Sequence, residues 1–359
     1  MRNDLAMKTK SGISLILVLL LAAVTAMGIY KLARPRILIL QSYDNSYAWT
    51  RDVDIGLHRV LDAHTDWSIR WHYMDLKRNP AQAQRDEAGA IARALIDQWA
   101  PKILVAIDDD AQAYAARFYN NNPNILIVFA GINGDAAAYG YDKSSNVTGI
   151  VERKQLAAIR DAIQNSDLEA TVLSSKRKNG DGLLRLMHLS DQSGSVEDDD
   201  RFIRNFDWLP LLFTGSRLVN TYAEWQAAVL SAPNRADVVL LTNYRLLARS
   251  STDPTLVPAA EIVRWTHANS RLPLIGANSF FVEDGGMLAI GTSGFEQGEV
   301  AANMVVRLMD GHTKPTDIAQ TETRQFVVSM RAKALAAHKL TLPKMYELAA
   351  RADGNYYED

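Results

Sequence analysis

Short, continuous apolar runs alternate with amphipathic stretches along most of this 359-residue chain. Continuous runs of this kind are typical of parallel strands that are buried on both faces of a sheet. They predict strands at Ile37–Leu40, Ile103–Ile107, Ile125–Ala130, Leu184–Leu189, Val238–Thr242 and Leu274–Ala277.

Helical periodicity occupies the segments between these runs. Asn79-Pro80 predicts an N-cap followed by a proline in the first helical position, and apolar residues then repeat at helical spacing as far as Trp99. Similar patterns predict helices at Val53–His64, Lys154–Ile163, Ala223–Leu230 and Glu299–Met309. Alternating strands and helices predict an α/β protein with parallel sheets, and the number of strands favours two doubly wound lobes over one small sheet.

The N-terminus carries a basic leader before an uncharged apolar run from Ile13 to Tyr30. This pattern indicates a secretory signal peptide or an uncleaved membrane anchor. The run would be about 27 Å long as a helix, which suits a thin bilayer, while Val24-Thr25-Ala26 fits a cleavage site. Either alternative predicts that the body from Arg34 onward is exported to the periplasm, tethered to the inner membrane by residues 13–30 if the leader is retained.

Composition and charge exclude several classes of function. The 39 basic residues nearly balance the 41 acidic ones without a basic stripe, which argues against a nucleic-acid partner. The absence of cysteine excludes disulfides, thiolate metal sites and cysteine nucleophiles. None of the seven histidines has metal-ligand spacing, and no nucleotide-binding glycine motif is present, so we expect no metal and no cofactor.

Two polar segments, Ser174–Asp181 and Ser190–Asp200, are predicted to be loops. The second contains the acidic run Glu197–Asp200, which lacks the ligand spacing of an EF-hand. An isolated charge run of this kind predicts a solvated surface turn.

Polar and aromatic side chains follow several predicted strands. In an open α/β sheet, ligands bind beyond the carboxyl ends of the strands, so these side chains predict a site for a small polar or aromatic ligand. The candidates are Ser42, Tyr43, Trp49, Asp108, Asp109, Asn133, Asn243, Tyr244 and Asn278, with Glu296 from the glycine-rich segment Gly291–Gly298. Tyr43, Tyr47 and Trp49 would cover one side of this site. Each residue also has a structural alternative, because aspartate can cap a helix, asparagine can serve a turn and tyrosine can pack in a core.

The same positions resemble a known family. The relevant features are Ser42-Tyr43 with Trp49, "ILVAI" followed by a polar residue, "IVFAGIN", "NVTGI" at Asn146–Ile150, and the segment that begins "GMLAIGTSGFEQGE" and ends "GHTKPTDI". Together they resemble ABC-transporter substrate-binding proteins, in particular the subgroup that includes tryptophan- and tyrosine-binding members. The resemblance extends from about Pro35 to Pro343.

This resemblance implies a type I periplasmic-binding-protein fold, in which three crossovers join two lobes. The first crossover would lie near Gly149, and the strand at Gln325–Ser329 would belong to lobe two. The implied division is a leader at residues 1–33, lobe one at 35–149 plus 287–311, lobe two at 150–286 plus 312–345, and a C-terminal tail at 346–359.

The implied function is capture of a small, amino-acid-like solute between the lobes and its presentation to an ABC importer. One alternative is a sensor that feeds a membrane signalling protein. Another is an extracytoplasmic enzyme with Asp108 and Asp109 as paired carboxylates. The chain departs from the subgroup in lacking a lipid-modified cysteine and in having Asp108–Asp110 where a small turn is expected, so its ligand could differ from an aromatic amino acid.

Overall fold

The computed structural model describes Leu21, Thr25, residues 34–168 and residues 182–359. The predicted leader and the predicted loop Ser174–Asp181 therefore lie almost wholly outside the described residues. Within the described residues, no helix combines the length and the apolar character needed to cross a membrane.

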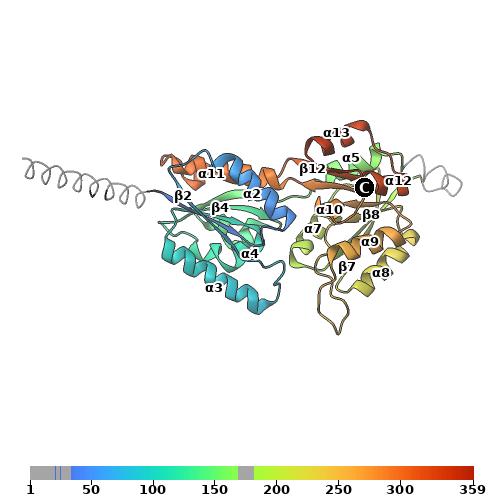
Figure 1. Cartoon of the computed structure of the whole chain (residues 1–359), viewed down its shortest axis with the longest axis horizontal. Coiled ribbons are helices and arrows are strands. Elements are labelled where there is room, and N and C mark those ends of the chain that lie inside the picture. The colour runs from blue at the N-terminus through green and yellow to red at the C-terminus, as the bar shows by residue number, and fades with distance from the viewer. Residues whose placement is uncertain (1–20, 22–24, 26–33, 169–181) are drawn as a thin grey trace, which may run out of the picture.

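The described residues form two lobes, each built on a largely parallel sheet (Figure 1). The sheet of the first lobe has the order β11 (Thr321–Glu322), β5 (Val147–Val151), β4 (Leu126–Ile132), β3 (Ile103–Ile107), β1 (Arg36–Gln41) and β2 (Ser68–Tyr73). The sheet of the second lobe has the order β13 (Tyr356–Tyr357), β12 (Phe326–Arg331), β10 (Leu288–Thr292), β9 (Leu274–Gly276), β8 (Val238–Leu241), β6 (Arg185–Asp191) and β7 (Leu212–Val219). Each of the six predicted strands is present, and the α/β class with two parallel-sheet lobes is confirmed.

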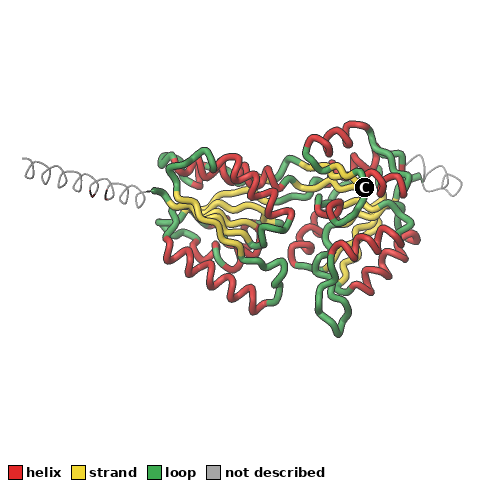
Figure 2. Tube along the Cα trace, in the orientation of Figure 1, coloured by secondary structure: helices red, strands yellow, loops and turns green. Residues whose placement is uncertain are grey.

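Helices cover both faces of each sheet (Figure 2). The first lobe contains α2 (Ala48–Leu61), α3 (Gln82–Trp99), α4 (Asp108–Tyr114) and α11 (Gly294–Met309). The second lobe contains α5 (Leu156–Asn165), α7 (Gly194–Asn205), α8 (Tyr222–Ser231), α9 (Ala259–Asn269), α10 (Phe280–Glu283), α12 (Ala332–Ala337) and α13 (Lys344–Ala352).

The continuous apolar runs are explained by this two-sided coverage. In β1, Ile37 and Ile39 belong to the core formed with α2 and α11, whereas Leu38 and Leu40 belong to the core formed with α3. Successive side chains of a strand point to opposite faces, so a strand with helices on both sides must be apolar at every position.

The chain crosses between the lobes three times. The crossovers are residues 152–155 between β5 and α5, Ser293 between β10 and α11, and residues 323–325 between β11 and β12. This arrangement agrees with the three-crossover hinge, and the first crossover lies just beyond the predicted Gly149.

The predicted lobe boundaries need three corrections. Residues 287–292 lie in the second lobe, because β10 pairs with β9 and β12 before the chain crosses. Residues 312–322 lie in the first lobe, because Ile318 packs in its core and Thr321–Glu322 pairs with β5. Residues 346–359 are an integral part of the second lobe, because α13 packs there and β13 pairs with β12.

After its crossover, α11 packs very closely on α2. A Cβ atom on Gly298 would lie 2.1 Å from the carbonyl oxygen of Val53, and one on Gly56 would lie 2.3 Å from that of Phe295. Only glycine permits two helix backbones to approach this closely, so these two residues allow α11 to pack directly on α2 of the first lobe.

Two local predictions are wrong. The helix after Asn79-Pro80 begins at Gln82, because the Asn79 side chain donates to the carbonyl oxygen of Asp75 instead of capping the helix. The acidic run Glu197–Asp200 is not a solvated turn: it lies on α7, with Asp199 and Asp200 buried.

Candidate functional site

A cavity of about 50 Å³, partly open to solvent, lies between the two lobes. We call it the first cavity. It is lined by Tyr43, Tyr47, Trp49, Lys77, Asp108, Asn133, Glu152, Lys154, Val196, Asp199, Thr242, Asn243, Asn278 and Phe280.

The structure brings most of the predicted site residues to this place. Of the ten candidates, Tyr43, Trp49, Asp108, Asn133, Asn243 and Asn278 line the first cavity. Asp109 lines a neighbouring cavity that shares Tyr43 with the first. Contact with a ligand stays a prediction for each of them.

Ser42, Tyr244 and Glu296 do not line the first cavity, because internal hydrogen bonds hold their side chains elsewhere. Ser42 Oγ donates to the carbonyl oxygen of Ile107 at 2.6 Å. The hydroxyl of Tyr244 donates to Asp284 Oδ2 at 2.5 Å. Both carboxylate oxygens of Glu296 accept from the backbone of the third crossover. Glu296 therefore connects α11 to the third crossover, while Ser42 and Tyr244 hold neighbouring backbone and side-chain groups in place.

Asp108 lines the first cavity and carries a buried carboxylate oxygen without a hydrogen-bond partner. It has a φ of 65° at the start of α4, and its Oδ1 accepts a 2.8 Å hydrogen bond from Trp49 Nε1. Its Oδ2 is buried with no hydrogen-bond partner among the described residues, and so is Asn133 Oδ1. A buried acceptor without a donor costs about 1–3 kcal/mol, so a ligand that supplies N–H groups would relieve this cost.

Burial raises the pKa of Asp108 well above its usual value, and the nearby carboxylate of Glu152 raises it further. The hydrogen bond from Trp49 opposes this shift. A cationic ligand would favour the ionised form and reverse the shift.

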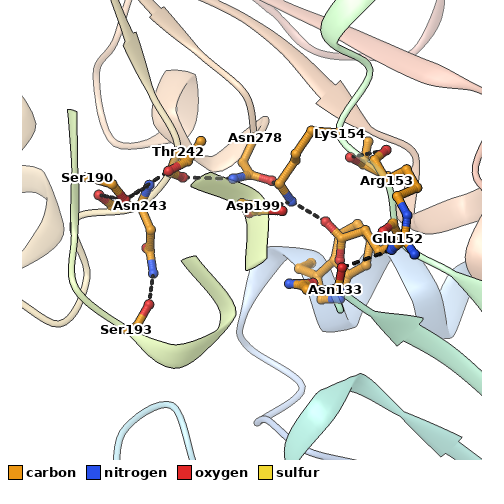
Figure 3. A network of polar contacts seen from close by, with 12 residues as sticks. Asn133, Glu152, Arg153, Lys154, Ser190, Ser193, Asp199, Thr242, Asn243 and Asn278 are labelled. Carbon is orange, nitrogen blue, oxygen red and sulfur yellow. Dashed lines mark hydrogen bonds and ion pairs between the residues drawn. The ribbon is translucent and has the colours of Figure 1, made fainter. Parts of the chain in front are cut away.

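Lys154 occupies the hinge side of the first cavity, at the centre of a network that joins both lobes (Figure 3). Its ammonium contacts Glu152 from the first crossover, lies 3.6 Å from Asp199 Oδ2 on α7, and donates to Asn278 Oδ1 at 3.3 Å. The side chains of Lys154 and Glu152 are each only 6% exposed. Burial would lower the pKa of Lys154, but Asp199 and Glu152 outweigh it and raise the pKa overall. Lys154 is therefore charged and already satisfied by protein groups.

Aromatic rings form one wall of the first cavity. Tyr43 and Tyr47 meet edge to face at 5.5 Å, and Tyr47 reaches across to Phe280 of the second lobe at 6.1 Å. Lys77 Nζ lies 5.0 Å from the Tyr43 ring centre and 5.5 Å from that of Tyr47. The positive charge of Lys77 acts on Asp108 and Asp110 and opposes the rise in their pKa values.

Several residues of the site were not predicted. Glu152 and Lys154 directly follow β5, so reading "NVTGI" as a strand would have found them by the strand-end rule. Asp199 belongs to the acidic run assigned to solvent, and only its pairing with Lys154 identifies it. Within the described residues, no group of three or more histidines or carboxylates could hold a metal ion.

Comparisons with known proteins agree with this architecture. Residues 224–353 match the family model described as ABC transporter substrate binding protein. None of the curated proteins compared with the chain matches it.

Three solved structures share the fold. A conserved domain protein from Vibrio cholerae is 15% identical with a TM-score of 0.58, covering 90% of this chain and 99% of its own. An ABC domain from Streptococcus pneumoniae in complex with L-Trp is 15% identical with a TM-score of 0.58, covering 88% and 98%. A ligand-free, open substrate binding protein with adhesive properties from Clostridium difficile is 14% identical with a TM-score of 0.54, covering 90% and 98%.

The chain thus has the two-lobed fold of periplasmic solute-binding proteins, with a cavity between its lobes. The match over residues 224–353 confirms the predicted resemblance to ABC-transporter substrate-binding proteins.

Trp49 provides a spectroscopic probe of the first cavity. Of the seven tryptophans, it alone is among the lining residues. We expect a bound solute to change the tryptophan fluorescence of the protein, and Trp49→Phe to remove that change while the protein stays folded. Trp99→Phe, on the outer helix α3, is the control and should keep the change. If Trp49→Ala lowers the melting temperature by several degrees and leaves the dissociation constant unaltered, Trp49 is a packing residue.

Proposed function

We propose that this protein captures a small solute with N–H donor groups between its two lobes, outside the cytoplasmic membrane. The observation that carries the proposal is the buried, unpaired Oδ2 of Asp108, a residue that lines a cavity between lobes that a three-crossover hinge connects. Binding, with no bond made or broken, is the whole of the proposed activity.

Solute binding would shift an equilibrium between open and closed arrangements of the lobes. Contacts that support a closed arrangement already span the lobes. They include the ion pair of Arg51 with Glu283 at 3.0 Å, the approach of Lys154 to Asp199, and the ring contact of Tyr47 with Phe280. A solute that bridges both walls of the first cavity would add to these contacts only when the lobes are closed.

The lining residues favour an amino-acid-like or related amine ligand. An ammonium group would donate to Asp108 and Asn133, and an acceptor group would meet Lys77. An apolar part would lie against Trp49 and Tyr43, where ring contacts contribute on the order of 1 kcal/mol. The Streptococcus pneumoniae relative in complex with L-Trp shows that this fold accommodates a ligand of that kind.

The family match supports an ABC importer as the partner that receives the closed form. The predicted leader supports a periplasmic location, with tethering if it is not cleaved. A membrane sensor would bind the same closed form. The two partners are distinguished by finding which membrane protein binds the solute-loaded chain.

The test is a melting-temperature screen of the purified protein against amino acids, amines, sugars, nucleosides and anions, followed by small-angle X-ray scattering with each positive solute. We expect at least one amine to raise the melting temperature and to reduce the radius of gyration. A protein that no solute of the panel stabilises or compacts would contradict the proposal.

A further inference from the structure

A second cavity of about 230 Å³ adjoins the first and also lies between the lobes. The two cavities share Tyr43 and Lys77. The other residues of the second cavity are Leu76, Arg85, Asp109, Asp110, Ala113, Tyr114 and Tyr139 from the first lobe, and Ser193, Asp198 and Leu246 from the second. A ligand long enough to extend beyond the Tyr43 side chain would occupy both cavities.

Acidic groups outnumber basic groups along this combined space. Its lining includes six carboxylates, Asp108, Asp109, Asp110, Glu152, Asp198 and Asp199, but only three cations, Lys77, Arg85 and Lys154. Carboxylates gathered in a partly buried space repel one another and lose hydration, so the arrangement favours a positively charged occupant.

Most of these carboxylates are already paired with cations. Lys154 contacts Glu152 and Asp199, Arg85 Nη1 lies 3.4 Å from Asp110 Oδ1, and Arg201 Nη2 lies 2.6 Å from Asp198 Oδ1. Among the described residues, no cation lies within ion-pair distance of Asp108 or Asp109. These two consecutive residues lie in different cavities, Asp108 in the first and Asp109 in the second.

Asp109 is held in place by neutral donors. Its Oδ1 accepts from the hydroxyl of Tyr139 at 2.8 Å, and its Oδ2 accepts from the backbone N–H of Asn133 at 3.3 Å. Burial raises the pKa of Asp109 to about 7, and the charges of Glu152 and Asp110 add to the rise. The two hydrogen bonds lower the pKa but do not cancel the effect of burial. A cation in the second cavity would stabilise its ionised form.

We propose that the solute is an elongated dication, with one N–H-bearing cationic group on Asp108 in the first cavity and another on Asp109 in the second. The proposal rests on the solute-binding function proposed above and names the class of ligand. A linear diamine, or an amine joined to a guanidine by an aliphatic stem, has this chemistry. The stem would pass beside the Tyr43 ring, which both cavities share. Arg85 pairs with Asp110, so it leaves Asp108 and Asp109 for the ligand.

The test compares cadaverine with pentylamine, which has the same stem and only one amine, by isothermal titration of the full-length chain in a mild detergent. We expect cadaverine to bind about tenfold more tightly or better, as a second charged hydrogen bond of roughly 1.5 kcal/mol or more requires. Asp109→Asn should bring cadaverine to nearly the affinity of pentylamine and leave pentylamine unchanged. Asp108→Asn should weaken both ligands.

Asp142→Asn, at an exposed position of the first lobe that lines neither cavity, is the matched control and should alter neither affinity. Melting temperatures without ligand verify folding, and Asp109→Asn should melt no lower than the unaltered protein, because it removes a carboxylate that burial disfavours. Equal affinities for cadaverine and pentylamine would overturn the dication proposal.

Tighter binding of L-tryptophan or a sugar than of cadaverine, with no effect of Asp109→Asn, would also overturn it. In both cases a solute is bound, so the proposed function stands. Failure of every solute to bind or to compact the protein would count against the proposed function itself and the dication with it.

Discussion

Replacing Lys154 by methionine should lower the free energy of unfolding by about 3–5 kcal/mol, because removing one partner of a buried ion pair leaves uncompensated charge. Lys154 has a side chain only 6% exposed, in contact with Glu152 and 3.6 Å from Asp199. Its loss would leave both carboxylates facing each other without a cation. Urea denaturation at pH 7.5, with the free energy extrapolated to water, measures the effect.

A double variant tests this explanation. Lys154→Met combined with Asp199→Asn removes one charge of each sign, and it should recover a substantial part of the lost stability. Lys102→Met, at an exposed position of the first lobe, should change the free energy of unfolding by less than about 0.5 kcal/mol. If Lys154→Met is no more destabilising than this control, the network in Figure 3 does not stabilise the two lobes.

Replacing Asp108 by asparagine should weaken binding of an amine solute by roughly 1.5–3 kcal/mol, the usual value of a hydrogen bond to a charged group. The substitution keeps the size of the side chain and an oxygen for Trp49 Nε1, but it removes the charge. Isothermal titration gives the affinity, and melting without ligand should show no loss of stability. An unaltered affinity would limit Asp108 to a structural role at the start of α4. Any enzymatic turnover that Asp108→Asn abolishes would instead favour the extracytoplasmic enzyme.

The pH dependence of amine binding follows from the same carboxyl group. Because burial holds the pKa of Asp108 well above its usual value, the group retains its proton in the empty protein over a wider range of pH. A cation binds the ionised form, so binding releases a proton and affinity rises with pH until the pKa is passed. Asp108→Asn should flatten this dependence.

The sequence predicted the strands of the two sheets well where both faces of a strand are buried. In β3, all five residues are buried, and the apolar run coincides with the strand. By contrast, β2 was missed: it lies at the edge of its sheet, and all but one of its residues are only partly buried, so its sequence lacks a continuous apolar run.

The site was harder to predict, because the end of a strand fixes where the backbone of a residue lies but not the direction of its side chain. Ser42 and Tyr43 are adjacent after β1, yet one bonds inward to Ile107 and the other lines both cavities. The burial of Asp199 depends on Lys154, which is distant in the sequence and adjacent only across the hinge. Lobe assignment failed at β10 for a related reason, since the sequence shows an apolar strand but not the sheet that it joins.

Closure of the lobes around a solute is the central claim, and a distance measured across the first cavity tests it most directly. The native chain has no cysteine, so cysteines introduced at Gln84 in the first turn of α3 and at Ser251 in an exposed loop of the second lobe carry two spin labels without side reactions. Double electron–electron resonance then compares the protein alone with the protein saturated by the solute that stabilises it most. We predict that the solute narrows the distance distribution towards its shortest component, and that Asp108→Asn requires a higher solute concentration for the same change. A distribution that a saturating, measurably bound solute leaves unaltered would contradict capture by closure of the two lobes.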